Sequence, residues 1–237
     1  MKEKSKYHIY DIVNIIVFYC TFLTFFVSLV VGIVELTRGQ ETGERVLYIA
    51  LLTLAMAIPY AIKKIFKITF SRVVSIVFYC YMFLSGFLGV VLELYRKVPG
   101  WDMFIHFIMG AILAVLSVYI LNYTIYKKDK SKHNLFFTFL FMILFAVGIG
   151  AIWELVEFIG DAWFNMGYQR YVTYEGIILI GREALMDTML DLCMDLLGAV
   201  SGVLFVYIIL QLNGRILKTF NIKKLKYKEQ EVEDIEE

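Results

Sequence analysis

The sequence predicts an all-α, polytopic integral membrane protein. The chain of 237 residues is 60% hydrophobic, and its mean hydropathy is +0.71. Charged residues make up 19% of it, whereas a soluble domain carries about a quarter. The charges are also clumped, so the apolar runs between them are long enough to cross about 30 Å of hydrocarbon. The formal net charge of +1 gives no reason to expect a nucleic-acid partner.

Six apolar runs can cross a membrane as helices that rise about 1.5 Å per residue. They lie at residues 12–36, 46–66, 73–95, 101–126, 134–159 and 184–212. We expect a single transmembrane domain over residues 1–213 and a charged cytoplasmic tail over residues 214–237. Segment 160–183 is the only long connection, and its Trp and Tyr residues are typical of a membrane interface.

The first run follows a lysine-rich N-terminus, as the core of a signal peptide does. It is about twice as long as such a core and no small-x-small cleavage site follows, so we interpret it as a retained span. The letters IVFYC recur at residues 16 and 76, and both runs end in a glycine, two or three further residues and then Glu-Leu. The stretch GAIWELVEFIGD from Gly150 repeats that ending. The repeats suggest three related helical hairpins.

The distribution of basic residues predicts the orientation. The N-terminus, the loops 63–72 and 127–133, and the C-terminal segment together hold 17 of the 23 Lys and Arg residues. Basic residues favour the cytoplasmic side, so both termini are expected there. The three cysteines, Cys20, Cys80 and Cys193, lie inside apolar runs and are expected to be packed core thiols.

This orientation brings the intramembrane acids to the outer ends of the spans. A carboxylate in hydrocarbon costs at least about 2.5–3.5 kcal/mol on insertion scales, so such residues normally face a partner, a cavity or an ion. Three polar stripes follow from helical spacing. They are Asp102 with His106, then Glu154 with Glu157 and Asp161, and Asp187 with Asp191 and Asp195. We expect these stripes to line a funnel that opens outward, with Asp195 deepest.

Three stretches resemble the YjdF-like family of bacterial inner-membrane proteins. They are WDMFIHFIMGAILA, WELVEFIGD and DTMLDLCMDLLGAVSG. The residues that carry the resemblance are Asp102, His106, Trp153, Glu154, Glu157, Asp161, Asp187, Asp191 and Gly198. The resemblance implies a multi-pass protein of the bacterial cytoplasmic membrane and no particular activity.

Carboxylates with one imidazole fit a hard divalent cation such as Mg²⁺, Mn²⁺ or Ca²⁺, or alternatively Zn²⁺. A three-histidine zinc site is excluded, because His106 is the only histidine within a span. The predicted ligands are Asp102, His106, Glu154, Glu157, Asp161, Asp187 and Asp191, with Glu93 and Asp195 as additional candidates. The alternative is a structural network of hydrogen-bonded acids.

Three functions are compatible with this site. The first is a metal-assisted hydrolase or transferase that acts on a lipid or lipid-linked headgroup, with His106 or Glu157 as general base. The second is a proton- or metal-coupled transporter in which the acids form a binding and relay path. Asp195, the deepest acid, is the residue that would distinguish this function from the first. The third is an accessory or sensor subunit without catalysis. The expected partners are the bilayer and a lipid-linked or small cationic ligand, and the oligomeric state is left open.

The orientation can be tested with reporter fusions. Fusions after Lys130 and at the C-terminus should report the cytoplasm, because the basic segments lie there. A fusion near Tyr171 should report the opposite side. A cytoplasmic signal at Tyr171 would overturn the orientation and the outward placement of the acids.

Overall fold

The computed structural model confirms the helical membrane class. It describes residues 2–39, 43–66, 68–69, 71–121, 134–164, 167–173, 176–212 and 223–224. Five of the described helices are long and apolar enough to span a membrane, and a bent helix pair makes a sixth if it counts as one span. The chain divides into two compact units, Met1–Phe83 with Leu217–Glu237, and Leu84–Ile216.

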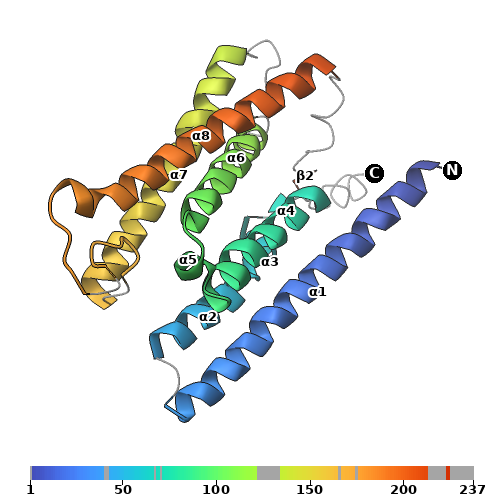
Figure 1. Cartoon of the computed structure of the whole chain (residues 1–237). Helices are drawn as coiled ribbons and strands as arrows, with labels where there is room; N and C mark the ends of the chain where they lie inside the picture. The colour runs from blue at the N-terminus through green and yellow to red at the C-terminus, as the bar shows by residue number, and fades with distance from the viewer. Residues whose placement is uncertain are drawn as a thin grey trace, which may run out of the picture. The chain divides into compact units, whose positions relative to one another are not determined.

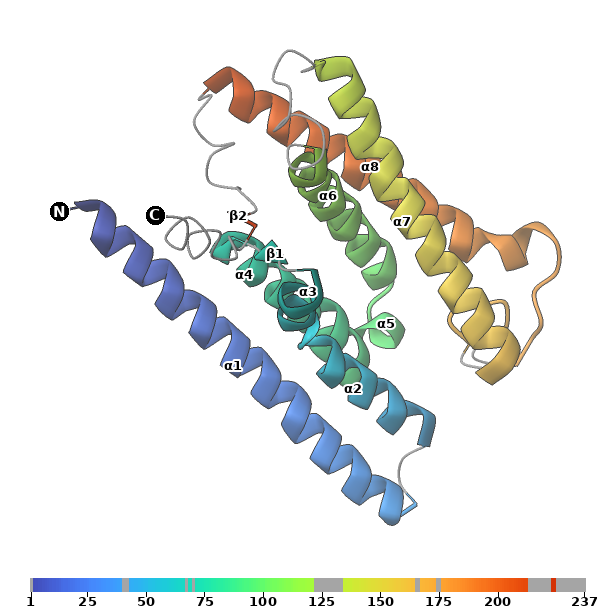
Figure 2. The ribbon, with the colours of Figure 1, turned by 180° about the vertical axis from the view of Figure 1, so that it is seen from behind.

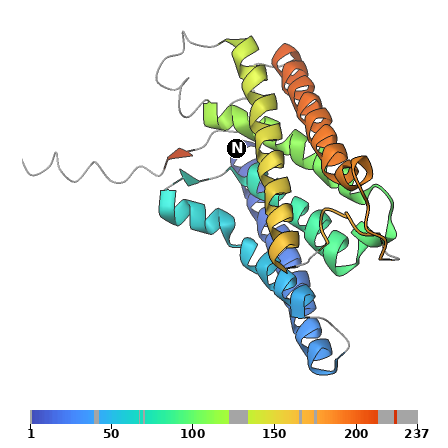
Figure 3. The ribbon, with the colours of Figure 1, turned by 90° about the vertical axis from the view of Figure 1, so that its left-hand side faces the viewer.

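In the first unit, the long helix α1 (Lys2–Thr37) packs against α2 (Gly43–Ala55) and α4 (Arg72–Met82), as Figure 1 shows. Phe25 is completely buried, and the rings of Phe18 and Tyr79 meet edge to face with centroids 5.1 Å apart. The strands β1 (Ile68–Thr69) and β2 (Lys223–Lys224) pair antiparallel (Figure 3). Most of the predicted tail 214–237 lies outside the described residues.

The second predicted span is broken into α2 and α3 (Ile58–Phe66), and the helix axis bends by 47° between them. Pro59 explains the break, because proline lacks the N–H that would bond back to Ala55 and its ring clashes with the carbonyl there. Bent in this way, the pair is either one broken span or a re-entrant loop.

The third predicted span, residues 73–95, ends earlier than expected. After α4 the chain widens into the π-helix η1 (Phe83–Val91), and the N–H of Leu92 donates to the carbonyl of Phe87 at 3.0 Å. Glu93 then adopts a left-handed backbone with φ 61° and occupies the N-cap position of the short α5 (Leu94–Lys97) without a side-chain capping hydrogen bond. The helical span therefore stops before Glu93, which lies in a turn.

The second unit holds three long helices, α6 (Trp101–Leu121), α7 (Leu135–Phe164) and α8 (Arg182–Leu212). Each packs against the other two, and α6 contacts α8 most extensively (Figure 2). Small residues such as Ala114, Ala146 and Ala199 are completely buried between them, whereas large apolar residues face outward. This inversion of sizes is typical of helices that pack closely in lipid. Helix α7 continues past the predicted end at residue 159, so Asp161 is helical.

Glycines permit the closest approach of the three helices. A Cβ at Gly198 on α8 would clash with the carbonyl oxygen of Phe107 on α6, and a Cβ at Gly110 would clash with the carbonyl oxygen of Asp195. On α7, a Cβ at Gly150 would collide with the carboxylate of Asp195. The backbones of α6 and α8 therefore touch directly, and Asp195 lies where all three helices meet.

The three cysteines are free and exposed, so the prediction of packed core thiols is wrong for them. In a membrane protein an apolar run does not imply burial by protein, because lipid covers the outer faces of the helices. The same reason accounts for outward-facing residues such as Leu144, which is 61% exposed.

The substitution Gly198→Ala should destabilise the protein by about 1–3 kcal/mol, because the added methyl group has no space against the α6 backbone. Gly148→Ala on α7 is the matched control, since nothing lies within 4 Å of its Cβ position. Thermal unfolding in detergent measures both variants. Equal melting temperatures for the two would contradict the close crossing.

Candidate functional site

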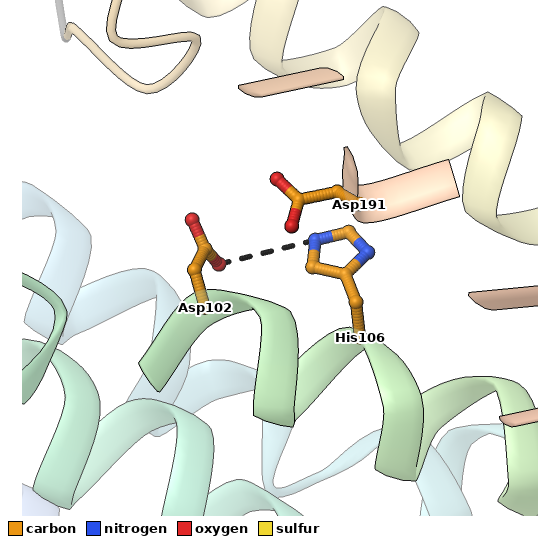
Figure 4. Close-up of side chains that lie close together, drawn as sticks. All are labelled: Asp102, His106 and Asp191. Carbon is orange, nitrogen blue, oxygen red and sulfur yellow. Dashed lines mark ion pairs between the residues drawn. The ribbon is translucent and has the colours of Figure 1, made fainter. Parts of the chain in front are cut away.

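The candidate site is centred on Asp102 and His106 of α6 and Asp191 of α8. One ligand atom from each of these residues lies within 4.8 Å of the other two. Figure 4 shows Asp102 and His106 rising from one face of α6 while Asp191 reaches toward them from α8. The side chains of His106 and Asp102 are 7% and 14% exposed, and Asp191 is 2% exposed. The i, i+4 spacing predicts that Asp102 and His106 share one face of α6. The crossing of α6 and α8 then brings Asp191, another predicted ligand, next to them.

Carboxylates from all three helices surround the imidazole of His106. Its Nε2 atom lies 3.9 Å from Asp102 Oδ1 and 3.9 Å from Glu154 Oε1 of α7. Its Nδ1 atom is 3.3 Å from Asp195 Oδ2, within hydrogen-bonding distance. The ring therefore connects the acids near the helix ends with the deepest acid.

Three deeply buried acids, Glu154, Asp191 and Asp195, each keep one oxygen without a hydrogen-bond partner among the described residues. Glu154 is 5% exposed, Asp191 2% and Asp195 0%. A buried carboxylate is strongly disfavoured unless a cation or hydrogen-bond donors offset its lost hydration. These free oxygens therefore have unused capacity to bind a cation or protons.

Arg170 approaches the acids from the connection between α7 and α8. Its Nη2 atom lies 2.9 Å from Asp102 Oδ2, and its Nη1 atom lies 3.3 Å from Asp187 Oδ1. Nη2 also donates to the carbonyl of Tyr95 at 3.4 Å. Sequence reasoning used Arg170 only to predict orientation and missed this contact. One sequence feature could have predicted the contact. Arg170 is the only basic residue between positions 160 and 181, and this segment is flanked by two predicted helices that carry acidic residues.

Asp161 holds this connection in place. Its two carboxylate oxygens accept hydrogen bonds from the N–H groups of Tyr168 at 2.7 Å and Gln169 at 2.9 Å. The Gln169 side chain in turn donates to Thr188 Oγ1 of α8 at 3.2 Å. Both oxygens of Asp161 thus hold the segment that carries Arg170, and its role as a metal ligand stays a prediction.

Two other predicted residues also have partners elsewhere. Glu157 accepts a hydrogen bond from Trp153 Nε1 at 2.8 Å, one turn away on the same helix. Glu93 pairs with Arg96 at 2.6 Å and with Lys97 at 3.3 Å. Neither belongs to the group formed by Asp102, His106 and Asp191, and their roles as ligand or base stay predictions.

Comparisons with known proteins agree with the membrane class. A family model described as "Predicted membrane protein (DUF2238)" matches residues 17–212, which include the whole site. A Thermotoga maritima protein described as uncharacterized is 29% identical over 149 residues, which cover 63% of this chain and 69% of that relative. No solved structure matches the chain. The matched family is consistent with the YjdF-like resemblance, whose narrower naming stays a prediction.

Arg170→Gln should lower the melting temperature, because Asp102 and Asp187 would lose the guanidinium charge between them. The Arg170 side chain is 38% exposed, so solvent screens the pair and the loss should be about 1 kcal/mol. The control Arg182→Gln alters an exposed residue at the start of α8 and should stay within about 0.5 kcal/mol of wild type. Indistinguishable melting of the two variants would show that the Arg170 contacts add no stability.

Proposed function

This chain belongs to the DUF2238 family of predicted membrane proteins, and we propose that it binds a divalent cation at a site buried among its membrane-spanning helices. The observation that carries the proposal is the group of Asp102, His106 and Asp191, whose ligand atoms lie within 4.8 Å of one another. The unpartnered Oδ1 atom of the buried Asp191 supports it independently.

The donor set narrows the choice of ion. Mg²⁺ and Ca²⁺ prefer oxygen ligands, whereas imidazole suits Zn²⁺ and other transition metals. Two carboxylates with one imidazole therefore favour Mn²⁺ or Zn²⁺ over Mg²⁺ or Ca²⁺. Glu154, with Oε1 at 3.9 Å from His106 Nε2, is the residue best situated to supply a fourth ligand.

The contact between His106 and Asp195 supports this assignment. Histidines that bind metals usually donate their second ring N–H to a carboxylate, which orients the ring and raises its basicity. Asp195 Oδ2 lies 3.3 Å from Nδ1, and an ionised carboxylate can only accept. Nδ1 would then be the donor, which leaves Nε2, on the side of Asp102 and Glu154, to bind the ion. Asp195 would act as a positioning residue.

A cation here would suit a membrane hydrolase or transferase that acts on a lipid or lipid-linked headgroup. The ion would activate water or polarise a phosphoryl oxygen. Within this proposal His106 and Glu154 are ligands, which leaves Glu157 as the candidate general base. The positive-inside distribution supports a bacterial cytoplasmic membrane location with both termini in the cytoplasm and the site toward the outside.

A transport function is supported less well than a site that opens to only one side of the membrane. A transport path needs polar groups that continue across the membrane. Beyond Asp195, α8 continues as LLGAVSGVLFVYIIL, whose only polar side chains are those of Ser201 and Tyr207. An accessory or sensor subunit would keep the cation site without turnover, so ion binding is the property to test first.

Mn²⁺ or Zn²⁺ should raise the melting temperature of the wild-type protein, because an ion that binds only the folded state stabilises it. The gain is about 2.7 kcal/mol at roughly 100 times the Kd. Asp191→Asn should abolish the shift, since it removes a charged ligand. Glu183→Gln, at an exposed position in the first turn of the same helix, should keep it.

Metal analysis of the purified protein accompanies these measurements, so that an ion retained through purification is detected. If no divalent ion shifts the wild-type melting temperature and none copurifies, the cation proposal fails. A hydrogen-bonded network of protonated acids would then be the better account of the site.

A further inference from the structure

In the connection between α7 and α8, residues 171–173 and 176–180 pair as the two arms of a small β-hairpin. An antiparallel bridge joins Val172 to Ile178. The N–H of Gly176 donates to the carbonyl of Thr173 at 2.9 Å and closes the turn. Gly176 has φ +81°, a backbone conformation that glycine adopts without strain. The described residues of the hairpin therefore form two short antiparallel arms.

The second arm of this hairpin presents apolar side chains that the described residues of its own unit leave exposed. Ile177, Ile178 and Ile180 are 61%, 67% and 82% exposed. The strand reads Gly-Ile-Ile-Leu-Ile-Gly over residues 176–181, without a charged or polar side chain. Contiguous exposed apolar residues of this kind mark a surface for membrane or protein contact.

The flanking helices indicate which partner covers the strand. Leu135–Trp163 and Arg182–Leu210 both qualify as membrane spans, so the hairpin connects two helix ends at the same membrane face. Trp163 at the end of α7 is 76% exposed, and tryptophan is enriched at the membrane interface. Leu185 in the first turns of α8 is 52% exposed. The apolar strand therefore continues an exposed apolar surface at the ends of two helices that qualify as membrane spans.

We propose that the hairpin inserts its isoleucine side chains into the lipid leaflet beside the ends of α7 and α8. The chemical partner is the boundary between headgroups and acyl chains. Arg170 directly precedes the hairpin and pairs with Asp102 and Asp187, so the anchor holds lipid next to the carboxylate site. The proposal does not require a bound cation and stands or falls separately from it.

Spin labelling in liposomes tests the anchor in the full-length chain. In a background with Cys20, Cys80 and Cys193 replaced by alanine, nitroxide labels are attached through Ile178→Cys and, separately, Ile180→Cys. Leu197→Cys is the lipid reference, because Leu197 is 54% exposed near the middle of α8. Lys130→Cys, in the charged stretch KKDKSKH that the sequence predicts to be a cytoplasmic loop, is the aqueous reference.

Labels at both positions should collide more with oxygen, which concentrates in lipid, than with a water-soluble nickel chelate. Their collision ratios should lie severalfold above that of Lys130→Cys and approach that of Leu197→Cys. Ratios like that of Lys130→Cys would overturn the proposal. Low accessibility to both reagents with dipolar broadening would also overturn it, because a second copy of the chain would then cover the strand.

Discussion

The close crossing of α6 and α8 is the constraint on which the site depends. Gly198 lies against the carbonyl of Phe107, and Gly110 lies against the carbonyl of Asp195, so no side chain separates the two backbones. At this separation the short aspartate side chains of α8 reach the imidazole of His106. Lipid offers no hydrophobic drive for helices to associate, so small residues and direct packing take on that role. The same glycines thus permit the packing and bring the charged groups together.

The acids divide into two groups according to the side chains beside them. Asp102 and Asp187 lie beside the guanidinium of Arg170, whereas Glu154 and Asp195 lie beside His106. In the second group, and in Asp191, one oxygen per residue remains without a hydrogen bond among the described residues. The protein therefore pairs the acids nearest the helix ends with its own cation and leaves oxygens of the deeper acids without partners among the described residues. The ion proposed beside His106 would bind such an oxygen of Asp191 and would share Asp102 with Arg170.

One connection links the membrane surface with this group. Asp161 at the end of α7 holds the backbone at Tyr168 and Gln169, Arg170 reaches the acids, and the apolar hairpin follows directly. Because Asp102 contacts both Arg170 and His106, an ion bound beside His106 would compete with the guanidinium for the same carboxylate. Arg170 is thus the side chain by which this segment contacts Asp102 and Asp187.

The sequence alone was sufficient for the fold class and for the presence of acids on α6, α7 and α8. Both depend on local properties, namely the length of apolar runs and the spacing of carboxylates along a helix. The break at Pro59 also has a local cause. The early end of the third span does not, because the π-helix and the left-handed Glu93 depend on how the chain turns into α5.

The tertiary structure decided which polar residues meet. Spacing put Glu154, Glu157 and Asp161 on one stripe of α7, but only Glu154 turns to His106, whereas Asp161 holds a loop and Glu157 bonds to Trp153. Arg170 joined the site although no helical pattern contains it. The rotation of each helix about its axis and the path of a connection are set by contacts between segments distant in sequence. Periodicity within one helix carries no information about either.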